Sequence, residues 1–350
     1  MILPGSDATS IAAGTDCIRA GGLLGLPTET VYGLAADADN DAAVARIFAA
    51  KGRPADHPLI VHVADASAVD HYASEVPDFA RALMAAFWPG PLTLILPRRP
   101  GIANAAAGGN PTVGLRCPSH PVAQALLAEL LEGAETASNF RRVWGLAAPS
   151  ANQFGRVSPT TAAHVQGEFG ETLLILDGGP CSVGIESSII DCTRGQPVLL
   201  RPGAITPGQV QAVCGFKVLQ KEELPAKASQ GPKASGTLDS HYAPSARVRL
   251  MDTAALRAGL GAIAAKTVSP AATENTVKPA IAVWSRSAVT LSSAPVIYRQ
   301  MPTDPAAAAQ QLFATLRELD TRGVNQIWIE TLPDTPDWDG VRDRLQRAAH

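Results

Sequence analysis

The sequence lacks the marks of several large protein classes. Its five cysteines are odd in number and contain no C-x-x-C pair, so neither a disulfide framework nor a thiolate zinc site is indicated. The first residues, MILPGSDATS, lack the basic start and apolar stretch of a signal peptide. No apolar run approaches the roughly 18 residues needed to cross a bilayer. These absences predict a protein of the reducing cytoplasm.

Aromatic residues and net charge are also scarce. Aromatic residues make up 5% of the 350-residue chain, and the formal net charge is −3. A nucleic-acid-binding module without catalysis would need a basic concave face, which this composition disfavours. A local basic groove would nevertheless be compatible with a net charge near zero for the whole chain. Nucleic acid is therefore not the expected direct ligand.

The familiar phosphate-binding and nucleophile motifs are missing. The chain has no G-x-x-x-x-G-K-[ST] loop and no G-x-G-x-x-G turn after a strand, which disfavours a P-loop nucleotidase and a dinucleotide-binding domain. It also has no G-x-S-x-G elbow and no H-E-x-x-H helix. Covalent hydrolase and zinc-protease mechanisms lose their support.

Lysine is rare in the first part of the chain. Lys51 is the only lysine among the first 216 residues, and it lies in the segment KGRPADHP. Cations favour a helix C-terminus for dipole reasons alone, which would explain Lys51 and Arg53 without a function. Alternatively, Gly52 and Pro54 force a turn that could hold both cations toward one point, as binding of a triphosphate requires.

The segments that are present alternate between strand-like and helix-like patterns, which predicts an α/β fold. We predict a catalytic domain over residues 5–207, an exposed linker rich in Lys, Pro, Gly and Ser over 208–243, and a smaller α/β domain over 244–350. Strands of the first domain are expected at GGLLGLP, HPLIVHV, PLTLILP, PTVGLRCP, WGLAAPS, TLLILDGG, SSIIDCT and PVLLRPG.

Small polar residues and cations follow several of these strands. PTETVYGL places Thr28, Glu29 and Thr30 at a strand exit, where open α/β sheets commonly hold ligands, although a simple turn explains the threonines as well. GLRCPSHP places Arg116 directly after a strand, where its guanidinium could grip a carboxylate or form a surface ion pair. His62 is either a ligand contact or an ordinary core histidine.

Two further segments join strands to helices or to other strands. APSANQFGRVSPT offers hydroxyl and amide groups that could receive an anion, or that could serve only as a loop with a helix N-cap. GIESSIID and VLLRPG place hydroxyls and an arginine at strand ends. Taken singly, each of these motifs has a structural explanation.

Seven of the segments occur in a specific order: PTETVYGL, KGRPADHPLIVHV, WPGPLTLIL, GLRCPSHP, APSAN, GIESSIID and VLLRPGAIT. Over about residues 10–207 the chain thereby resembles the YrdC/Sua5 family, the threonylcarbamoyl-AMP synthases. SHYAP and the segment after it resemble the longer, two-domain Sua5 form. The resemblance implies a YrdC-like twisted open sheet flanked by helices, a linker and a smaller, Rossmann-like Sua5 domain.

The resemblance also implies an activity. L-threonine, bicarbonate and ATP, with Mg²⁺, would give threonylcarbamoyl-AMP and pyrophosphate, and the product would feed the t6A modification of adenosine 37 in tRNA through a downstream transfer machinery. No resident metal ligand is implied, and direct binding of tRNA would be weak or indirect. The alternative is a non-catalytic RNA-binding or regulatory YrdC-like protein.

The family motifs also imply site residues. The K-x-R and S-x-N signatures match Lys51 and Arg53, the expected catalytic cations, and Ser150 and Asn152. The implied L-threonine site consists of Thr30, His62, Arg116, the Ala148 backbone and Ser187. The implied ATP site consists of Arg53, His57, Thr112, Ser150, Asn152, Ser158, Arg201 and Tyr242. A linker carrying His241 and Tyr242 would close over the site during turnover, because a carbamate decomposes readily in water.

The chain departs from the family pattern at two places that bear on the site. The run GTLDSHYAP has Leu238 where the family often has a lysine, which removes one expected phosphate contact. The segment 132–145 is longer than usual and adds Arg141 and Arg142, which we interpret as a surface excursion.

Overall fold

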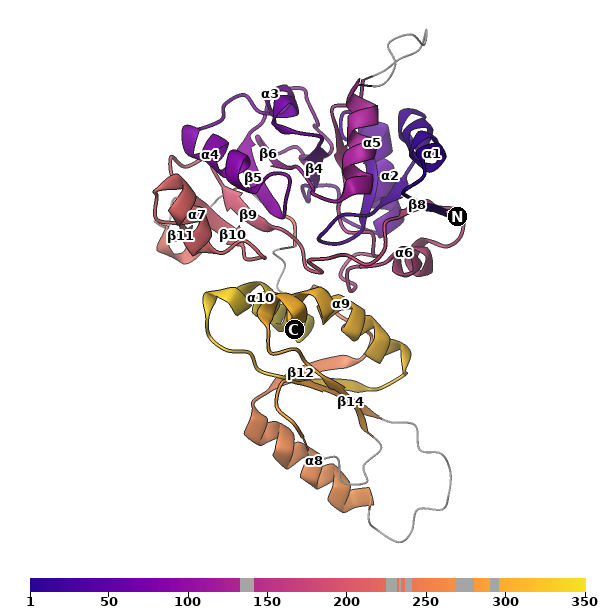
Figure 1. The fold of residues 1–350 in the computed structure, drawn as a ribbon, viewed down its shortest axis with the longest axis vertical. Coiled ribbons are helices and arrows are strands. Elements are labelled where there is room, and N and C mark those ends of the chain that lie inside the picture. Colours follow the sequence, from indigo (N-terminus) through magenta and orange to yellow (C-terminus); the bar gives the residue numbers. More distant parts are fainter. Residues whose placement is uncertain (133–141, 225–231, 233, 237–240, 268–279, 290–295) are drawn as a thin grey trace. The chain divides into compact units, whose positions relative to one another are not determined.

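The computed structural model describes residues 1–132, 142–224, 232, 234–236, 241–267, 280–289 and 296–350 (Figure 1). Contacts divide the chain into two units. The first comprises Met1–Phe154 and Ser158–Thr237, and the second comprises Gly155–Val157 and Leu238–His350. The predicted α/β class is confirmed in both units.

The first unit is built on a mixed eleven-stranded sheet. From one edge to the other its strands are β1 (Ile2–Pro4), β8 (Leu174–Asp177), β2 (Leu24–Leu26), β3 (Gly33–Asp37), β7 (Gly145–Ala147), β4 (Ile60–Val63), β6 (Thr112–Arg116), β5 (Leu92–Pro97), β9 (Ser188–Asp191), β10 (Val198–Arg201) and β11 (Leu219–Gln220). The sheet contains both parallel and antiparallel strand pairs. The β4–β6 and β5–β9 pairs are parallel.

Helices cover this sheet. They are α1 (Ala8–Arg19), α2 (Asp41–Lys51), α3 (Val69–Tyr72), α4 (Asp78–Phe87), α5 (Pro121–Glu132), α6 (Ala162–Phe169) and α7 (Pro207–Cys214), with short 3₁₀ turns at Ala66–Ala68 and Lys221–Glu223. Side-chain oxygens cap three of them: Asn40 accepts from Ala43 N, Thr161 from His164 N, and Thr206 forms a capping box with Gln209.

Alternate residues of one strand enter two different hydrophobic clusters, which shows that both faces of the sheet are buried. On β3, Leu34 and Ala36 pack with residues of α2 and α4, whereas Ala35 packs with residues of α1 and α5. Successive side chains of a strand point to opposite faces, so the sheet lies between these two layers.

Part of the segment 208–243, predicted as an exposed linker, has regular structure. Helix α7 covers the start of that segment, and β11 adds to the sheet by pairing in parallel with β10. The capping box of Thr206 and Gln209 and the left-handed Gly215 fix the two ends of the helix. The polar composition of the segment hid these short elements.

The second unit contains a four-stranded sheet in the order β12 (Arg247–Met251), β15 (Gln326–Glu330), β13 (Ile281–Ser285) and β14 (Val296–Gln300). All three strand pairs are parallel. Helix α8 (Thr253–Thr267) lies on one side of the sheet, and α9 (Pro305–Thr321) and α10 (Asp339–Ala348) lie on the other (Figure 1). A 3₁₀ turn at Pro336–Trp338 precedes α10. This doubly covered parallel sheet agrees with the predicted Rossmann-like domain.

No helix in the described ranges is both long and apolar enough to span a bilayer.

Gly145 at the start of β7 occupies a position with no room for a side chain. A Cβ there would lie 2.8 Å from the His62 carbonyl oxygen and 2.9 Å from a methyl of Val61. We expect Gly145→Ala to cost about 1–3 kcal/mol of the free energy of unfolding and to lower Tm by about 3–10 °C. Gly167→Ala is the matched control, because a Cβ in that exposed position of α6 meets nothing within 4 Å. Equal Tm values for the two variants would contradict this account.

Candidate nucleotide and amino-acid site

Arg116, at the end of β6, is a buried cation with fixed partners. It is 3% exposed and forms an ion pair with Glu29, at 2.6 Å between Nη2 and Oε1. Its Nη1 donates to the Thr30 hydroxyl at 2.6 Å, and its Nε donates to the Gly90 carbonyl at 3.2 Å. The surface ion pair considered as an alternative from the sequence is therefore wrong, because both charged groups are inside the protein.

In the Thr-Glu-Thr turn, one threonine stabilises the turn itself and the other contacts Arg116. Thr28 serves the turn: its hydroxyl donates to the Val31 carbonyl at 2.6 Å and accepts from Thr30 N and Val31 N. Thr30 instead presents its hydroxyl to Arg116. Glu29 also accepts from Ser119 N at 3.1 Å. The structural explanation thus holds for Thr28, and the neighbouring Glu29 and Thr30 join the charged cluster.

His62 lies next to this cluster on β4, directly paired with Arg116 of β6. It is buried, and desolvation followed by the nearby Arg116 charge lowers its pKa to about 3. His62 is therefore neutral near pH 7 and can act there only as a hydrogen-bonding or packing group.

Ser187 and Arg201 form a second buried cluster. Arg201, at the end of β10, donates from Nε and Nη2 to the Ser187 carbonyl at 3.1 and 2.9 Å, and from Nη2 to the Ser187 hydroxyl at 3.2 Å. The Ser187 hydroxyl also shares a hydrogen bond of 2.7 Å with Thr93 on β5. Ser187, a predicted threonine contact, is thereby hydrogen-bonded to Arg201, a predicted nucleotide contact.

Arg53 and Arg201 converge on one residue of the linker segment. Arg53 Nη2 donates to the Ser235 hydroxyl at 3.3 Å and to the Pro58 carbonyl at 3.0 Å. Arg201 Nη1 donates to the Ser235 carbonyl at 2.8 Å. The two guanidinium groups, far apart in sequence, therefore point their donors at neighbouring oxygens, as two cations that bind one phosphate chain must do.

Lys51 does not project into open space. It is the last residue of α2, it is 2% exposed, and its ammonium donates to the Ser150 carbonyl at 2.5 Å and to the Asn152 carbonyl. Gly52 follows with a φ of 62°, which turns the chain directly after it. Lys51 thus holds the shape of the Ser150–Asn152 loop.

This burial changes the acid–base behaviour of Lys51. Desolvation, reinforced by the charge of Arg53, lowers its pKa from 10.5 to about 7, although Glu168 and Glu186 act in the opposite direction. Lys51 is therefore close to half protonated at neutral pH.

The other predicted nucleotide residues are distributed unevenly. Ser158 donates to the buried Glu186 carboxylate at 2.5 Å, and Asn152 turns its amide to the Gln153 carbonyl at 2.7 Å. The His57 ring lies edge-on to Phe154 at 5.7 Å between centroids, and the Arg53 guanidinium lies 5.9 Å from the same ring. Thr112 begins β6 opposite Pro97, and no hydrogen bond of its side chain to these clusters occurs among the described residues.

The Ala148 backbone, predicted to contact threonine, uses its N–H within the fold: it donates to the Ile60 carbonyl at 3.1 Å.

Tyr242 belongs to the second unit. It is buried, has a φ of 61°, and packs its ring against His241, Phe313 and Arg344, all of the second unit. The guanidinium of Arg344 lies 5.8 Å from the ring centroid, and Arg344 is itself fully buried and paired with Asp343 at 3.0 Å. The predicted nucleotide contact of Tyr242 stays a prediction.

The two departures from the family pattern fall largely on positions 133–141 and 237–240, so Leu238 and Arg141 lie outside the described residues. Of the segment 132–145, predicted as a surface excursion, the structure describes Glu132, which ends α5, and residues 142–145. The Arg142 guanidinium lies 5.2 Å from the ring centroid of Trp144, but Val143 is buried and Gly145 begins β7, so the end of the segment is part of the core and not a surface excursion.

No cysteine near the site offers a thiolate. Burial raises the pKa of Cys117 to about 11 and that of Cys181 to about 12, so both thiols are protonated near pH 7. All five cysteines are free.

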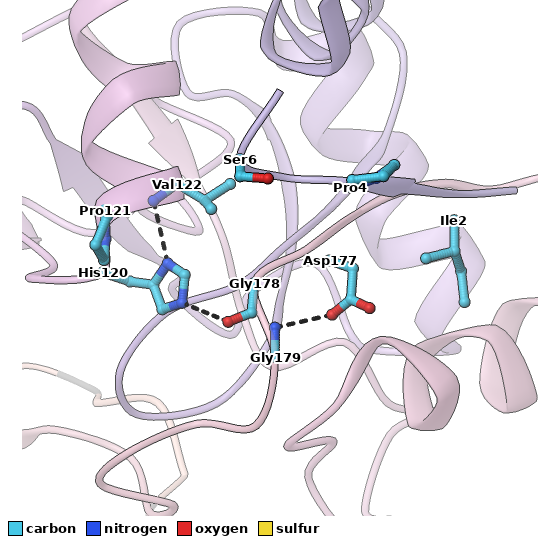
Figure 2. Close-up of a pocket in the computed structure, with 9 residues that line it drawn as sticks. All are labelled: Ile2, Pro4, Ser6, His120, Pro121, Val122, Asp177, Gly178 and Gly179. Atoms are coloured by element: carbon cyan, nitrogen blue, oxygen red, sulfur yellow. Dashed lines mark hydrogen bonds between the residues drawn. The ribbon is translucent and has the colours of Figure 1, made fainter. Parts of the chain in front are cut away.

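Figure 2 shows a pocket elsewhere in the first unit, with a cavity volume of about 650 Å³. His120 donates from Nε2 to the Gly178 carbonyl at 3.2 Å and accepts from Val122 N at Nδ1, also at 3.2 Å. Asp177 accepts from Gly179 N at 2.9 Å. The polar groups that line this pocket are hydrogen-bonded to one another or to neighbouring residues such as Tyr32 and Asp7, and none of them was predicted as a site residue.

The sequence analysis did not assign a site role to four residues that the structure places in these clusters: Glu29, Thr93, Glu186 and Ser235. Glu29 and Glu186 lie within the motifs PTETVYGL and GIESSIID. Their roles become visible only from their contacts with Arg116 and Ser158, which are distant in sequence. Thr93 is a single hydroxyl within the apolar run PLTLILP, which was a usable signal. Ser235 lies in a segment of linker composition, and nothing there distinguished it.

Two family models together match almost the whole chain. The model for Sua5, YciO and YrdC, described as telomere recombination, matches residues 16–203, and the model described as the threonylcarbamoyl-AMP synthase C-terminal domain matches residues 205–350. The chain belongs to the Sua5/YciO/YrdC family. The resemblance stated from its motifs is confirmed.

Two relatives named threonylcarbamoyl-AMP synthase match this chain over two thirds or more of both sequences. Threonylcarbamoyl-AMP synthase of Bacillus subtilis is 36% identical over 341 residues, which is 97% of this chain and 92% of the relative. The protein of that name from Pyrococcus abyssi is 44% identical over 243 residues, 69% of this chain and 67% of the relative.

Two solved structures of P. abyssi Sua5 match both units. The complex with L-threonine has a TM-score of 0.80 at 34% identity and covers 97% of this chain and 94% of that one. A variant with a histidine and the following tyrosine replaced by alanine has a TM-score of 0.83 at 33% identity, with coverage of 100% and 96%. The fold prediction is thereby confirmed.

The buried ammonium of Lys51 makes stability depend on pH. Between the folded pKa of about 7 and the unfolded value of 10.5 the unfolded chain binds more protons, so the free energy of unfolding rises with pH in this window. The penalty of burying the charge is complete below the folded pKa and disappears above the unfolded one. Relative to Lys51→Met, the wild type should gain about 2 kcal/mol between pH 7 and pH 9.

Urea unfolding at a series of pH values measures this difference. Lys217→Met is the matched control, because the Lys217 side chain is 66% exposed, and its curve should run parallel to the wild type. A Lys51→Met curve that also ran parallel to the wild type would refute the buried-charge interpretation.

Proposed function

We propose that this family member is an L-threonylcarbamoyladenylate synthase, which forms threonylcarbamoyl-AMP and pyrophosphate from L-threonine, bicarbonate and ATP. The observation that carries the proposal is the convergence of Arg53 and Arg201 on adjacent oxygens, with Ser187 linking Arg201 to the face of the sheet that holds Arg116. The relatives named threonylcarbamoyl-AMP synthase support the same activity.

The Arg116–Glu29 pair suits a free amino acid. An α-amino acid carries one carboxylate and one ammonium, and the pair presents a guanidinium beside a carboxylate at 2.6 Å. A zwitterion can exchange partners with such a pair without leaving a buried charge unmatched, whereas a substrate of single charge could not. Thr30 and the neutral His62 would complete the surroundings of the bound amino acid.

The Ser235 oxygens mark where phosphate oxygens would bind. Its hydroxyl and carbonyl occupy donors of Arg53 and Arg201, and ionised phosphate oxygens are stronger acceptors than either group. ATP would therefore displace Ser235 from the two arginines. Lys51 would act indirectly, by holding the Ser150–Asn152 loop. The negative charge of ATP nearby would favour the protonated form of Lys51.

The chemistry requires placement and charge stabilisation. After its ammonium group gives up a proton to water, the threonine nitrogen attacks the carbon of bicarbonate and, with loss of water, gives the carbamate. A carbamate oxygen then attacks the α-phosphorus as the bond from the α-phosphorus to the bridging β-phosphate oxygen breaks. The electron pair leaves with pyrophosphate, whose growing negative charge Arg53 and Arg201 would stabilise. No covalent protein intermediate is needed.

Mg²⁺ would arrive with ATP and neutralise phosphate charge. Mg²⁺ commonly binds through substrate phosphates and one or two carboxylates. The buried Glu186, whose charge acts on Lys51, is a carboxylate suited to such an ion, and no group of three or more metal-binding side chains occurs in the described part of the chain.

The product would pass to a downstream machinery that transfers the threonylcarbamoyl group to tRNA adenosine 37. We place this reaction in the cytoplasm, in keeping with the five free cysteines.

Pyrophosphate release tests the proposal directly. We expect release from ATP and Mg²⁺ that requires both L-threonine and bicarbonate, and we expect Arg53→Ala to reduce it about 100-fold, as removal of a donor to a developing charge does. Arg46→Ala, on the helix α2 that precedes Arg53, should keep wild-type activity, because Arg46 contacts the Gly21 carbonyl, away from these clusters.

If the wild type releases pyrophosphate at the same rate without L-threonine, the proposed synthase is wrong. If it releases none under any condition yet binds L-threonine, the alternative of a catalytically silent family member is favoured instead.

A further inference from the structure

Thr93 belongs to a row of polar residues that crosses three adjacent strands and continues to Ser187, the residue before β9. The strand order β4, β6, β5, β9 pairs His62 with Arg116 and, by the register of Leu94 with Leu115, places Thr93 opposite Arg116. On the other side Thr93 pairs with Ile189, and Ser187 is two residues before it. Paired residues, and residues two apart on a strand, share one face of a sheet.

Three members of this row, His62, Arg116 and Ser187, are among the expected threonine contacts, and Thr93 lies between Arg116 and Ser187. We infer that Thr93 is a positioning residue for the amino-acid substrate, acting through the hydroxyl of Ser187. The inference rests on the proposed function and adds to it a residue without a role so far.

Hydrogen-bond direction carries the argument. Arg201 has only donors, so the Ser187 hydroxyl oxygen accepts from it. When Thr93 also donates, across the 2.7 Å contact, the acceptor capacity of Ser187 is filled. The hydrogen of Ser187 is then left to be donated to an oxygen of the bound amino acid. Thr93 thereby fixes the orientation of a group that would otherwise rotate.

The position of Arg201, an expected ATP contact, does not depend on the Thr93 hydroxyl. Arg201 keeps two hydrogen bonds to the Ser187 carbonyl, at 3.1 and 2.9 Å, whatever the Ser187 side chain does. Loss of the Thr93 hydroxyl should therefore weaken the binding of threonine without weakening the binding of ATP.

The test compares Thr93→Val, which keeps the shape and removes the hydroxyl, with Thr93→Ser, which keeps the hydroxyl. We expect Thr93→Val to raise KM for L-threonine and the calorimetric Kd for L-threonine about three- to tenfold, the effect of one hydrogen bond. KM for ATP should stay within about twofold, and Thr93→Ser should restore threonine binding.

Thr15→Val is the matched control. Thr15 is a buried threonine on α1, and its hydroxyl has no hydrogen-bond partner in the described part of the chain. It reports what a buried threonine-to-valine change does to Tm alone.

Three outcomes overturn the inference. If Thr93→Val lowers Tm but leaves KM for L-threonine unchanged, Thr93 is only structural. If the KM values for L-threonine and ATP rise together, the argument that the Thr93 hydroxyl affects threonine binding alone is wrong. If the wild type shows neither L-threonine binding nor threonine-dependent pyrophosphate release, the proposed function falls and this inference falls with it, whereas the first two outcomes leave the proposed function intact.

Discussion

Buried positive charge is the constraint on which the first unit depends. Lys51, Arg116 and Arg201 are each at most 3% exposed, and a buried cation is costly unless oxygen atoms surround it. Each cation therefore fixes a segment: Lys51 holds the loop after β7, Arg116 holds the turn after β2, and Arg201 holds the chain before β9. The sheet brings these segments together, and the cations prevent them from relaxing apart.

Because these cations already have partners, the binding proposed above would proceed by exchange. Arg116 would trade contacts with Glu29 and Thr30, and Arg53 and Arg201 would trade those with Ser235. Such exchange keeps the desolvation cost nearly constant between the free and the bound protein, because the guanidinium groups are out of water in both. Affinity then depends on how much better the substrate oxygens are placed than the oxygens they replace.

The sequence predicted the α/β class and the strand-end residues, because those depend on local patterns. It did not reveal β3, whose Leu-Ala-Ala run lacks the β-branched residues typical of strands, nor the strand order, which pairs β1 with β8 across more than 170 residues. Arg116 was recognisable from its place after a strand. The inward direction of Lys51 and the contacts of Ser235 were not, because both depend on partners distant in sequence.

The assignment of Gly155–Val157 to the second unit has a consequence for biosynthesis. These residues are made early, yet Gly155 accepts from Ala243 N and the Val157 carbonyl accepts from Arg317 on α9, which leave the ribosome much later. The connection between Asn152 and Ser158 must therefore wait for the last third of the chain before it acquires its final contacts. Translation that stopped after the first sheet would leave Gly155 and Val157 without these two donors, whereas Lys51 would still hold the Ser150–Asn152 loop.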